Sequence, residues 1–172
     1  MRKSRSKAWR GGAALAAALV CGAPGADAQA PAAGTACRGM MAGTYLATIR
    51  TEAGAFASRA LVTIHGDGTL VIADSRQHQG VTGSSFSAQQ GGYRCTGART
   101  AQAVVLNFGF PPQEGIARSE WSLAYDPANG VLRGTITLTI FVGVEGVDPF
   151  ALGGKPMGTF TFGALRVAPR AK

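Results

Sequence analysis

The 172-residue sequence lacks a long hydrophobic run. Its most apolar uncharged stretch, residues 11–21, is well short of the ~20 residues that a membrane-spanning helix needs, and no later segment approaches that length. Five basic residues and no acid precede this stretch, and Ala26-Asp27-Ala28 follows it with small residues at the −3 and −1 positions of a cleavage site. We therefore predict a signal peptide over residues 1–28, no transmembrane segment, and a periplasmic or extracellular location.

Other routes of export have less support in the same region. A lipoprotein would use Cys21 as its anchor, but Val20 stands where a small residue is expected. Twin-arginine export would need an Arg-Arg pair, and the sequence contains none.

Cysteine is scarce, with three residues in the whole chain. Cys21 would leave with the leader, so Cys37 and Cys95 remain as a pair in an oxidising compartment. A disulfide between them would stabilise the fold by about 4 kcal/mol in the loop-entropy model, and would tie a flexible N-terminal arm, residues 29–41, to the body. The alternative is a redox-active or metal-binding pair, for which the C-x-x-C spacing is missing.

Runs of positive charge are also missing from the body of the chain. The formal net charge of +8 falls to +4 when five basic residues and Asp27 leave with the leader. The remaining basic residues are scattered singly, which argues against a nucleic-acid partner.

Helical periodicity is weak, and no stretch forms an amphipathic helix of ordinary length. The dominant apolar period after the leader is two residues, which is typical of β-strands, and Gly-, Pro- and Asp-containing turns interrupt it. The expected strands are Thr44–Arg50, Ser58–His65, Thr69–Ser75, Ser84–Ala88, Gly92–Thr96, Ala101–Phe110, Ile116–Asp126, Val131–Val142 and Gly158–Val167.

The apolar parity of neighbouring strands predicts the register of two hairpins. Both strands of a hairpin must turn their apolar residues to one side, so Asp126 should pair with Val131, which places Trp121 opposite Ile136. By the same reasoning Ile64 pairs with Leu70, and Gly68 takes the left-handed position of the loop between them.

Sequential hairpins of this kind predict an all-β fold. We expect a single antiparallel up-and-down β-barrel of about eight strands over residues 42–168, followed by a short tail, residues 169–172. A two-sheet β-sandwich is the alternative.

The first strand opens with Gly43-Thr44-Tyr45, and meandering hairpins and a short aromatic last strand follow it. This arrangement resembles the calycin type of small barrel found in lipocalins and allene-oxide-cyclase-like proteins. Lipocalins carry Gly-x-Trp where this chain has Tyr45, and no counterpart of their later Arg-bearing motif stands out. The resemblance implies an interior that holds one small, mostly apolar ligand.

Aromatic and aliphatic residues suggest where such a ligand would bind. We expect one face of the strand Ala101–Phe110 to point inward, with Asn107 and Gly109 outside. The candidate ligand-binding residues are Leu106, Phe108, Phe110, Trp121, Tyr125, Phe160 and Phe162. The alternative is that these side chains simply fill a narrow barrel.

The segment Gly143–Met157 is long for a loop in a compact domain. Phe150 and Leu152 on it could act as a lid over the mouth of the barrel. Irregular packing without a functional role is the alternative.

Catalytic motifs are missing: there is no Gly-x-Ser-x-Gly elbow, no His-Glu-x-x-His and no phosphate-binding glycine loop. A metal site would have to combine His65, Asp67, Asp74 and His78, which match no ligand spacing, so we expect no metal and no cofactor. Glu114 and Glu120 could pair for glycoside chemistry, although Glu120 lies on a polar face where it would offset Arg118 or an arginine of a neighbouring strand.

Three classes of function remain open after these exclusions. A binding module for a small apolar or amphiphilic molecule is the first hypothesis. A structural or interaction protein of the cell envelope with a filled barrel is the second, and an allene-oxide-cyclase-like isomerase is the third. Catalysis is the less favoured expectation, and the oligomeric state stays open.

Overall fold

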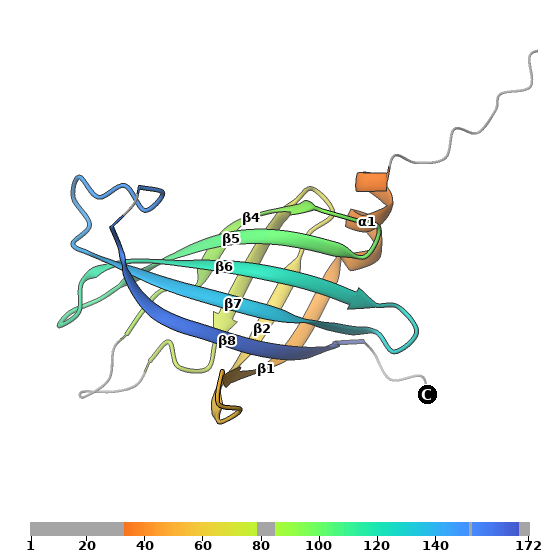
Figure 1. Ribbon diagram of the computed structural model, residues 1–172, viewed down its shortest axis with the longest axis horizontal. Helices are drawn as coiled ribbons and strands as arrows, with labels where there is room; N and C mark the ends of the chain where they lie inside the picture. The colour runs from red at the N-terminus through yellow and green to blue at the C-terminus, as the bar shows by residue number, and fades with distance from the viewer. Residues whose placement is uncertain (1–32, 79–84, 152, 169–172) are drawn as a thin grey trace, which may run out of the picture. The chain divides into compact units, whose positions relative to one another are not determined.

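The computed structural model describes residues 33–78, 85–151 and 153–168. Within them, eight antiparallel strands form a closed barrel in which each strand bonds to the next and β8 returns to β1 (Figure 1). The predicted up-and-down barrel is therefore confirmed, and the sandwich alternative is not. The strands are β1 Gly43–Thr51, β2 Phe56–Ile64, β3 Thr69–Asp74, β4 Gln89–Cys95, β5 Thr100–Gly109, β6 Gly115–Asp126, β7 Val131–Val142 and β8 Lys155–Arg166. The signal peptide predicted over residues 1–28 lies outside the described residues, as does the tail, residues 169–172.

Both hairpin registers agree with the prediction. Asp126 pairs with Val131 and Trp121 with Ile136, while Ile64 pairs with Leu70. Gly68 has a φ of +99°, the left-handed conformation expected in its loop. These pairings follow from the two-residue period, because a slip of one residue would turn every apolar side chain outward.

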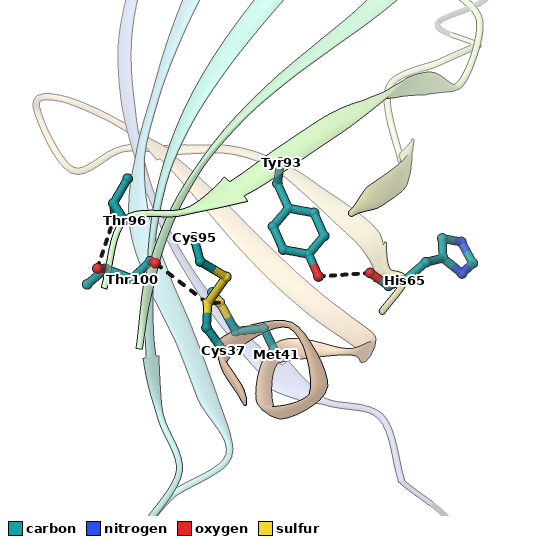
Figure 2. Close-up of a disulfide and its surroundings, with 7 residues drawn as sticks. All are labelled: Cys37, Met41, His65, Tyr93, Cys95, Thr96 and Thr100. Atoms are coloured by element: carbon teal, nitrogen blue, oxygen red, sulfur yellow. Dashed lines mark hydrogen bonds between the residues drawn. A yellow bond between two sulfur atoms is a disulfide. The ribbon is translucent and has the colours of Figure 1, made fainter. Parts of the chain in front are cut away.

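A short helix, α1 (Ala33–Met41), precedes the barrel and corrects the expectation of a flexible arm over that stretch. Nine residues make a marginal helix in isolation, so its stability must come from contacts with the barrel. Cys37 and Met41, one turn apart, are both fully buried, and Cys37 is bonded to Cys95 at the end of β4 (Figure 2). The predicted disulfide is present, and it holds a helix rather than a loose segment.

The expected strand Ser84–Ala88 does not form as a continuous strand. Ser85 and Phe86 make isolated bridges to His78 and Gly109, and Ser84 lies outside the described residues. The backbone N–H of Ser87 donates to Phe108 O at 2.9 Å. These isolated contacts take the place of a continuous β-ladder over residues 85–88, and the regular strand β4 begins only at Gln89.

Strand β5 faces the opposite way from the prediction. Ala103, Val105 and Asn107 are buried inside the barrel. Leu106 and Phe108 point outward, and Phe108 is 50% exposed. Both faces of this strand carry apolar residues, so its own pattern does not discriminate between them. Its pairing with β6 decides, because Ala103 lies opposite the inward-facing Trp121.

Helix α1 covers one end of the barrel, and the opposite end carries the loops β1–β2, β3–β4, β5–β6 and β7–β8 (Figure 1). The half next to α1 is filled by large side chains. Its fully buried members include Met41, Tyr45, Ile64, Leu70, Leu123 and Leu132. Within the described residues no helix has the length and apolar character that crossing a membrane requires.

Candidate functional site

A cavity of about 780 Å³ that opens to solvent lies in the barrel at the end away from α1. This volume lies in the range of small-molecule binding sites. The cavity is bounded by inward-facing residues from the far halves of the strands and by residues of the loops at that end. We treat it as the candidate functional site.

Two aromatic rings form the floor between the cavity and the filled half. The rings of Trp121 and Phe162 lie 5.0 Å apart between centroids and are tilted by 59°. Phe162 is paired with Gly134, and a Cβ at that glycine would lie 3.2 Å from the Phe162 ring and collide with the Ser122 carbonyl. Glycine at position 134 therefore makes room for the aromatic floor.

One side of the cavity is polar. Consecutive strands from β2 to β6 each contribute one inward-facing polar side chain, and we call this set the polar wall. Its members are Ser58, Asp74, Gln89, Asn107 and Ser119.

Burial and pairing establish the direction of these side chains. Ser58, Asn107 and Ser119 are between 4% and 7% exposed, and all line the cavity. Gln89 pairs with the fully buried Ile72, and Asp74 pairs with the buried Ala60. The Ser58 hydroxyl donates to Asp74 Oδ2 at 2.8 Å, which joins two members of the wall.

The opposite side of the cavity is apolar. It is built by β7, β8 and β1, and its inward-facing residues are Ile136, Leu138, Ile140, Phe160 and Ile49. We call this set the apolar wall.

Two buried polar atoms of the cavity residues have no hydrogen-bond partner among the described residues. They are the indole Nε1 of Trp121 and the amide Oε1 of Gln89. Buried polar groups in folded proteins almost always have a partner, and leaving one unpaired costs about 1–3 kcal/mol. Neighbouring atoms screen both from the cavity, so neither is a group that a molecule in the cavity would contact.

Charged side chains lie at the mouth. The outer part of the cavity is lined by three exposed charged residues, Arg76, Glu114 and Lys155, so charges of both signs lie at the mouth.

Glu114 is one of the two carboxylates considered for glycoside chemistry. The other, Glu120, faces outward as predicted, and of the two partners expected for it the structure shows Arg118, in an ion pair at 3.1 Å.

The predicted ligand-binding residues are only partly brought together. Trp121 and Phe160 line the cavity, and Phe162 supports its floor. Tyr125 lies in the filled half, where its ring meets that of Tyr45 edge to face at 6.2 Å.

Three of the predicted ligand-binding residues lie outside the barrel. Leu106, Phe108 and Phe110 do not point into it, and Phe110 is 44% exposed. The prediction that they are interior residues is wrong, because both faces of β5 are apolar and its pairing with β6 determines which face points inward.

The polar wall was not predicted, although part of its signal is present in the sequence. Ser58 shares the parity of Ala60 and Val62, and Ser119 shares that of Trp121. A serine at an inward position of a strand is a sign of a polar interior. Asn107 was expected outside, and its position could have been corrected from the pairing of its strand with β6.

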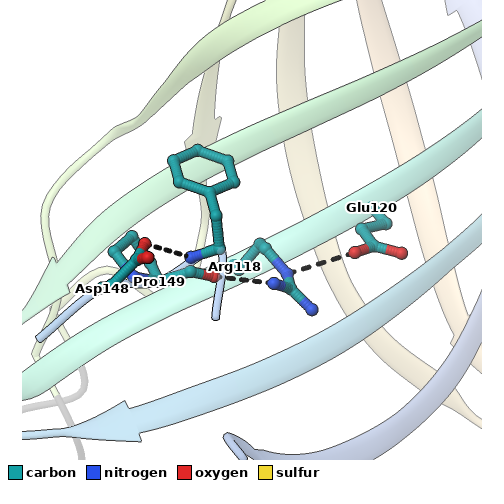
Figure 3. Close-up of polar contacts among 5 residues, drawn as sticks. Arg118, Glu120, Asp148 and Pro149 are labelled. Carbon is teal, nitrogen blue, oxygen red and sulfur yellow. Dashed lines mark hydrogen bonds and ion pairs between the residues drawn. The ribbon is translucent and has the colours of Figure 1, made fainter. Parts of the chain in front are cut away.

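The loop between β7 and β8 is held against the outer surface of the barrel. The Arg118 guanidinium donates to Pro149 O at 2.7 Å (Figure 3). It also lies 5.4 Å from the centroid of the Phe141 ring. Phe150 is 65% exposed and is not among the residues that line the cavity. Leu152 lies outside the described residues, so the lid remains a hypothesis for which the observed loop position offers no support.

The residues weighed as a metal site lie apart. Asp67 is in the loop before β3, at the α1 end, whereas Asp74 ends β3 at the cavity. Across the described part of the chain, no three His, Cys, Asp or Glu residues are grouped as metal ligands.

The α1 end is fastened by an arginine from the last strand. Arg166 donates to the carbonyls of Met40 and Ala42 and to the Tyr45 hydroxyl, and its guanidinium lies 5.4 Å from the centroid of the Tyr45 ring. The Tyr45 hydroxyl in turn donates to Met41 O at 2.8 Å. Burial raises the pKa of Tyr45 above its ordinary value, and the hydrogen bond to Arg166 opposes that rise.

Tyr93 shows the same effect at this end of the barrel. Its hydroxyl donates to His65 O at 2.8 Å (Figure 2). Burial raises the pKa of Tyr93 as well. These contacts indicate a structural role for the α1 end, in contrast to the open cavity.

Comparisons with models of known families, with curated proteins and with solved structures find no match to this chain.

Proposed function

We propose that this protein is an exported binding protein that holds a small apolar or amphiphilic molecule in the open half of its barrel. The observation that carries the proposal is the cavity of about 780 Å³, which has inward-facing polar side chains on one side and apolar side chains on the other. A barrel with a purely structural role needs no such space, because small barrels are normally filled by their own side chains. The disulfide is compatible with an exported protein.

Binding accounts for the composition of the walls better than catalysis does. The polar wall contains one ionisable side chain, Asp74, and its Oδ2 accepts a hydrogen bond from the Ser58 hydroxyl. Acid–base chemistry generally uses a positioned donor and a positioned acceptor of protons, and no second ionisable group belongs to this wall. The wall is suited to orienting a ligand by hydrogen bonds.

A pair of matched substitutions tests the proposal. Ala117 lines the cavity, whereas Ala124 lies on the same strand with outward-facing neighbours, Thr100 and Arg133. Replacing each with phenylalanine adds the same side chain inside the cavity in one variant and outside it in the other.

The measurement is the fluorescence of N-phenyl-1-naphthylamine, a neutral probe whose emission rises in apolar surroundings. The parent protein and Ala124→Phe should bind one probe molecule with similar affinity, and Ala117→Phe should bind it at least about tenfold more weakly. Circular dichroism should show all three proteins folded. A parent protein that does not bind the probe, or an Ala117→Phe variant that binds as well as the parent, would refute the proposal.

A further inference from the structure

The two walls of the cavity differ in polarity across the barrel rather than along it. The polar wall occupies five adjacent strands, β2 to β6, and the apolar wall occupies the other three, β7, β8 and β1. A molecule lying along the barrel axis would therefore have one side against hydrogen-bonding groups and the other against hydrocarbon. Shape and polarity together select for a ligand with that asymmetry.

Two amides form the centre of the polar wall. Gln90 pairs with Leu106 on the outside of the barrel, and Gln89 and Asn107 are the next residues on the same two strands. Both line the cavity. Between them the two amides offer donors and acceptors, so the pair is suited to a ligand with a donor and an acceptor close together on one edge.

The charge of the polar wall further limits the classes of ligand that fit the cavity. Asp74 carries its one ionisable group, and its two carboxylate oxygens accept from the Ser58 hydroxyl and from the backbone N–H of Arg76, both at 2.8 Å. The basic groups that line the cavity, Arg76 and Lys155, are exposed at the mouth. A negative group against the polar wall would face the Asp74 carboxylate, whereas the exposed basic groups Arg76 and Lys155 lie at the mouth, so the wall favours neutral or cationic molecules.

Resting on the ligand-binding function proposed above, we infer that the cavity takes a compact, neutral or cationic molecule whose hydrogen-bonding groups lie along one side. A long-chain amphiphile with a single polar head is a poor match. Its tail would pass along both walls and leave the amides of Gln89 and Asn107 unpaired beside hydrocarbon.

Three small probes of similar size separate these ligand classes. The first is 2-quinolinone, which has an N–H donor and a carbonyl acceptor on one edge and hydrocarbon on the other. The second is its N-methyl derivative, which keeps the shape and the acceptor but loses the donor. The third is 1-nonanol, a chain with one polar head. Each is titrated against the full-length protein loaded with N-phenyl-1-naphthylamine, and the half-displacing concentration is measured.

We expect 2-quinolinone to displace the fluorescent probe at a concentration about tenfold lower than either comparison molecule. Gln89→Leu and Asn107→Leu should each reduce this preference to about threefold or less, because leucine has a similar size and no hydrogen-bonding group. Gln90→Leu is the matched control. This glutamine lies next to Gln89 but faces outward, so its replacement should leave the preference unchanged.

The outcomes distinguish this inference from the proposed function. If N-phenyl-1-naphthylamine binds in the cavity but 1-nonanol or N-methyl-2-quinolinone displaces it as well as 2-quinolinone does, the inference is refuted and ligand binding stands. A preference that survives in both Gln89→Leu and Asn107→Leu also refutes it. If the fluorescent probe does not bind at all, both proposals fail.

Discussion

The two halves of this barrel are built from the same eight strands with the same alternation, yet one is filled and the other is hollow. In the half next to α1, the inward positions hold bulky residues such as Tyr45, Leu123 and Leu132, all at most 1% exposed. In the other half, the same strands turn small or polar residues inward, among them Ser58 and Ser119. Strand number sets the width of a barrel, so side-chain size decides whether a given layer is packed or open.

The helix reinforces this difference. Met41 and Cys37 of α1 cover the end of the filled half, and the disulfide and Arg166 hold α1 in this position. No helix among the described residues covers the other end. A filled half that maintains the fold and a hollow half that is free to bind are therefore separable, and substitutions in each should affect different properties.

Removing the disulfide should have the largest effect on stability. The double variant Cys37→Ser/Cys95→Ser frees α1 from β4 and restores the chain entropy of a loop with a sequence separation of 58. We expect the free energy of unfolding to fall by about 4 kcal/mol. Denaturant unfolding followed by circular dichroism measures this.

The same variant also tests whether the halves are independent. Under conditions where it remains folded, it should bind N-phenyl-1-naphthylamine with nearly the affinity of the parent protein. A loss of binding in the folded variant would show that the α1 end controls the cavity and that the two halves are not independent.

A leucine pair on one strand compares the two halves directly. Leu132 is fully buried in the filled half, while Leu138 lines the cavity six residues further along β7. Leu132→Ala should cost about 2–5 kcal/mol, because it leaves an empty space in a packed core. Leu138→Ala should cost less than about 1.5 kcal/mol, since its side chain already borders open space.

The same denaturant experiment measures both leucine variants. Equal losses of stability would mean that the cavity end is packed as tightly as the α1 end. That result would remove the basis for the comparison and for the proposed binding site.

Alkaline pH should produce the smallest effect, and it should arise at the filled end. Burial raises the pKa of Tyr45 and Tyr93 above the ordinary value of about 10. Above that pH the unfolded chain loses phenolic protons that the folded protein still retains, so the free energy of unfolding should fall as pH rises. Below it, these two groups contribute no pH dependence.

Denaturant midpoints between pH 8 and pH 11 measure this dependence. Tyr45→Phe should unfold with a shallower pH dependence over the same range, because one of the two groups is removed. A slope identical to that of the parent protein would show that Tyr45 does not contribute to the effect.

Much of the fold could be predicted because, in most strands, the alternation of apolar and polar residues identifies the inward face. In β6 and β7, large apolar residues alternate with polar ones, and this alone placed Trp121 opposite Ile136. The inward face of β5 could not be predicted in this way, because Val105 lies on one face and Leu106 and Phe108 lie on the other. When both faces of a strand are apolar, the two-residue period is still visible, but the pairing with a neighbouring strand determines which face points inward.

The candidate site was harder to predict for the same reason. Trp121 and Phe160 were found because large aromatic residues stand out on a strand. Ser58, Gln89 and Asn107 were missed because single polar residues in strands more often face water than the interior. Their common feature, a place on the inside of five adjacent strands, exists only once the barrel has closed.

The order of residues by itself determined eight of the nine expected strands, two of their hairpin registers and the partner of each remaining cysteine, because these depend on local alternation, turn residues and simple pairing. Closure of the barrel decided the rest. It turned β5 inward on the side of its smaller residues, ordered residues 33–41 as a helix against the core, and gathered five polar side chains around one space. Those outcomes depend on contacts between strands that are distant along the chain, and local periodicity carries no information about such contacts.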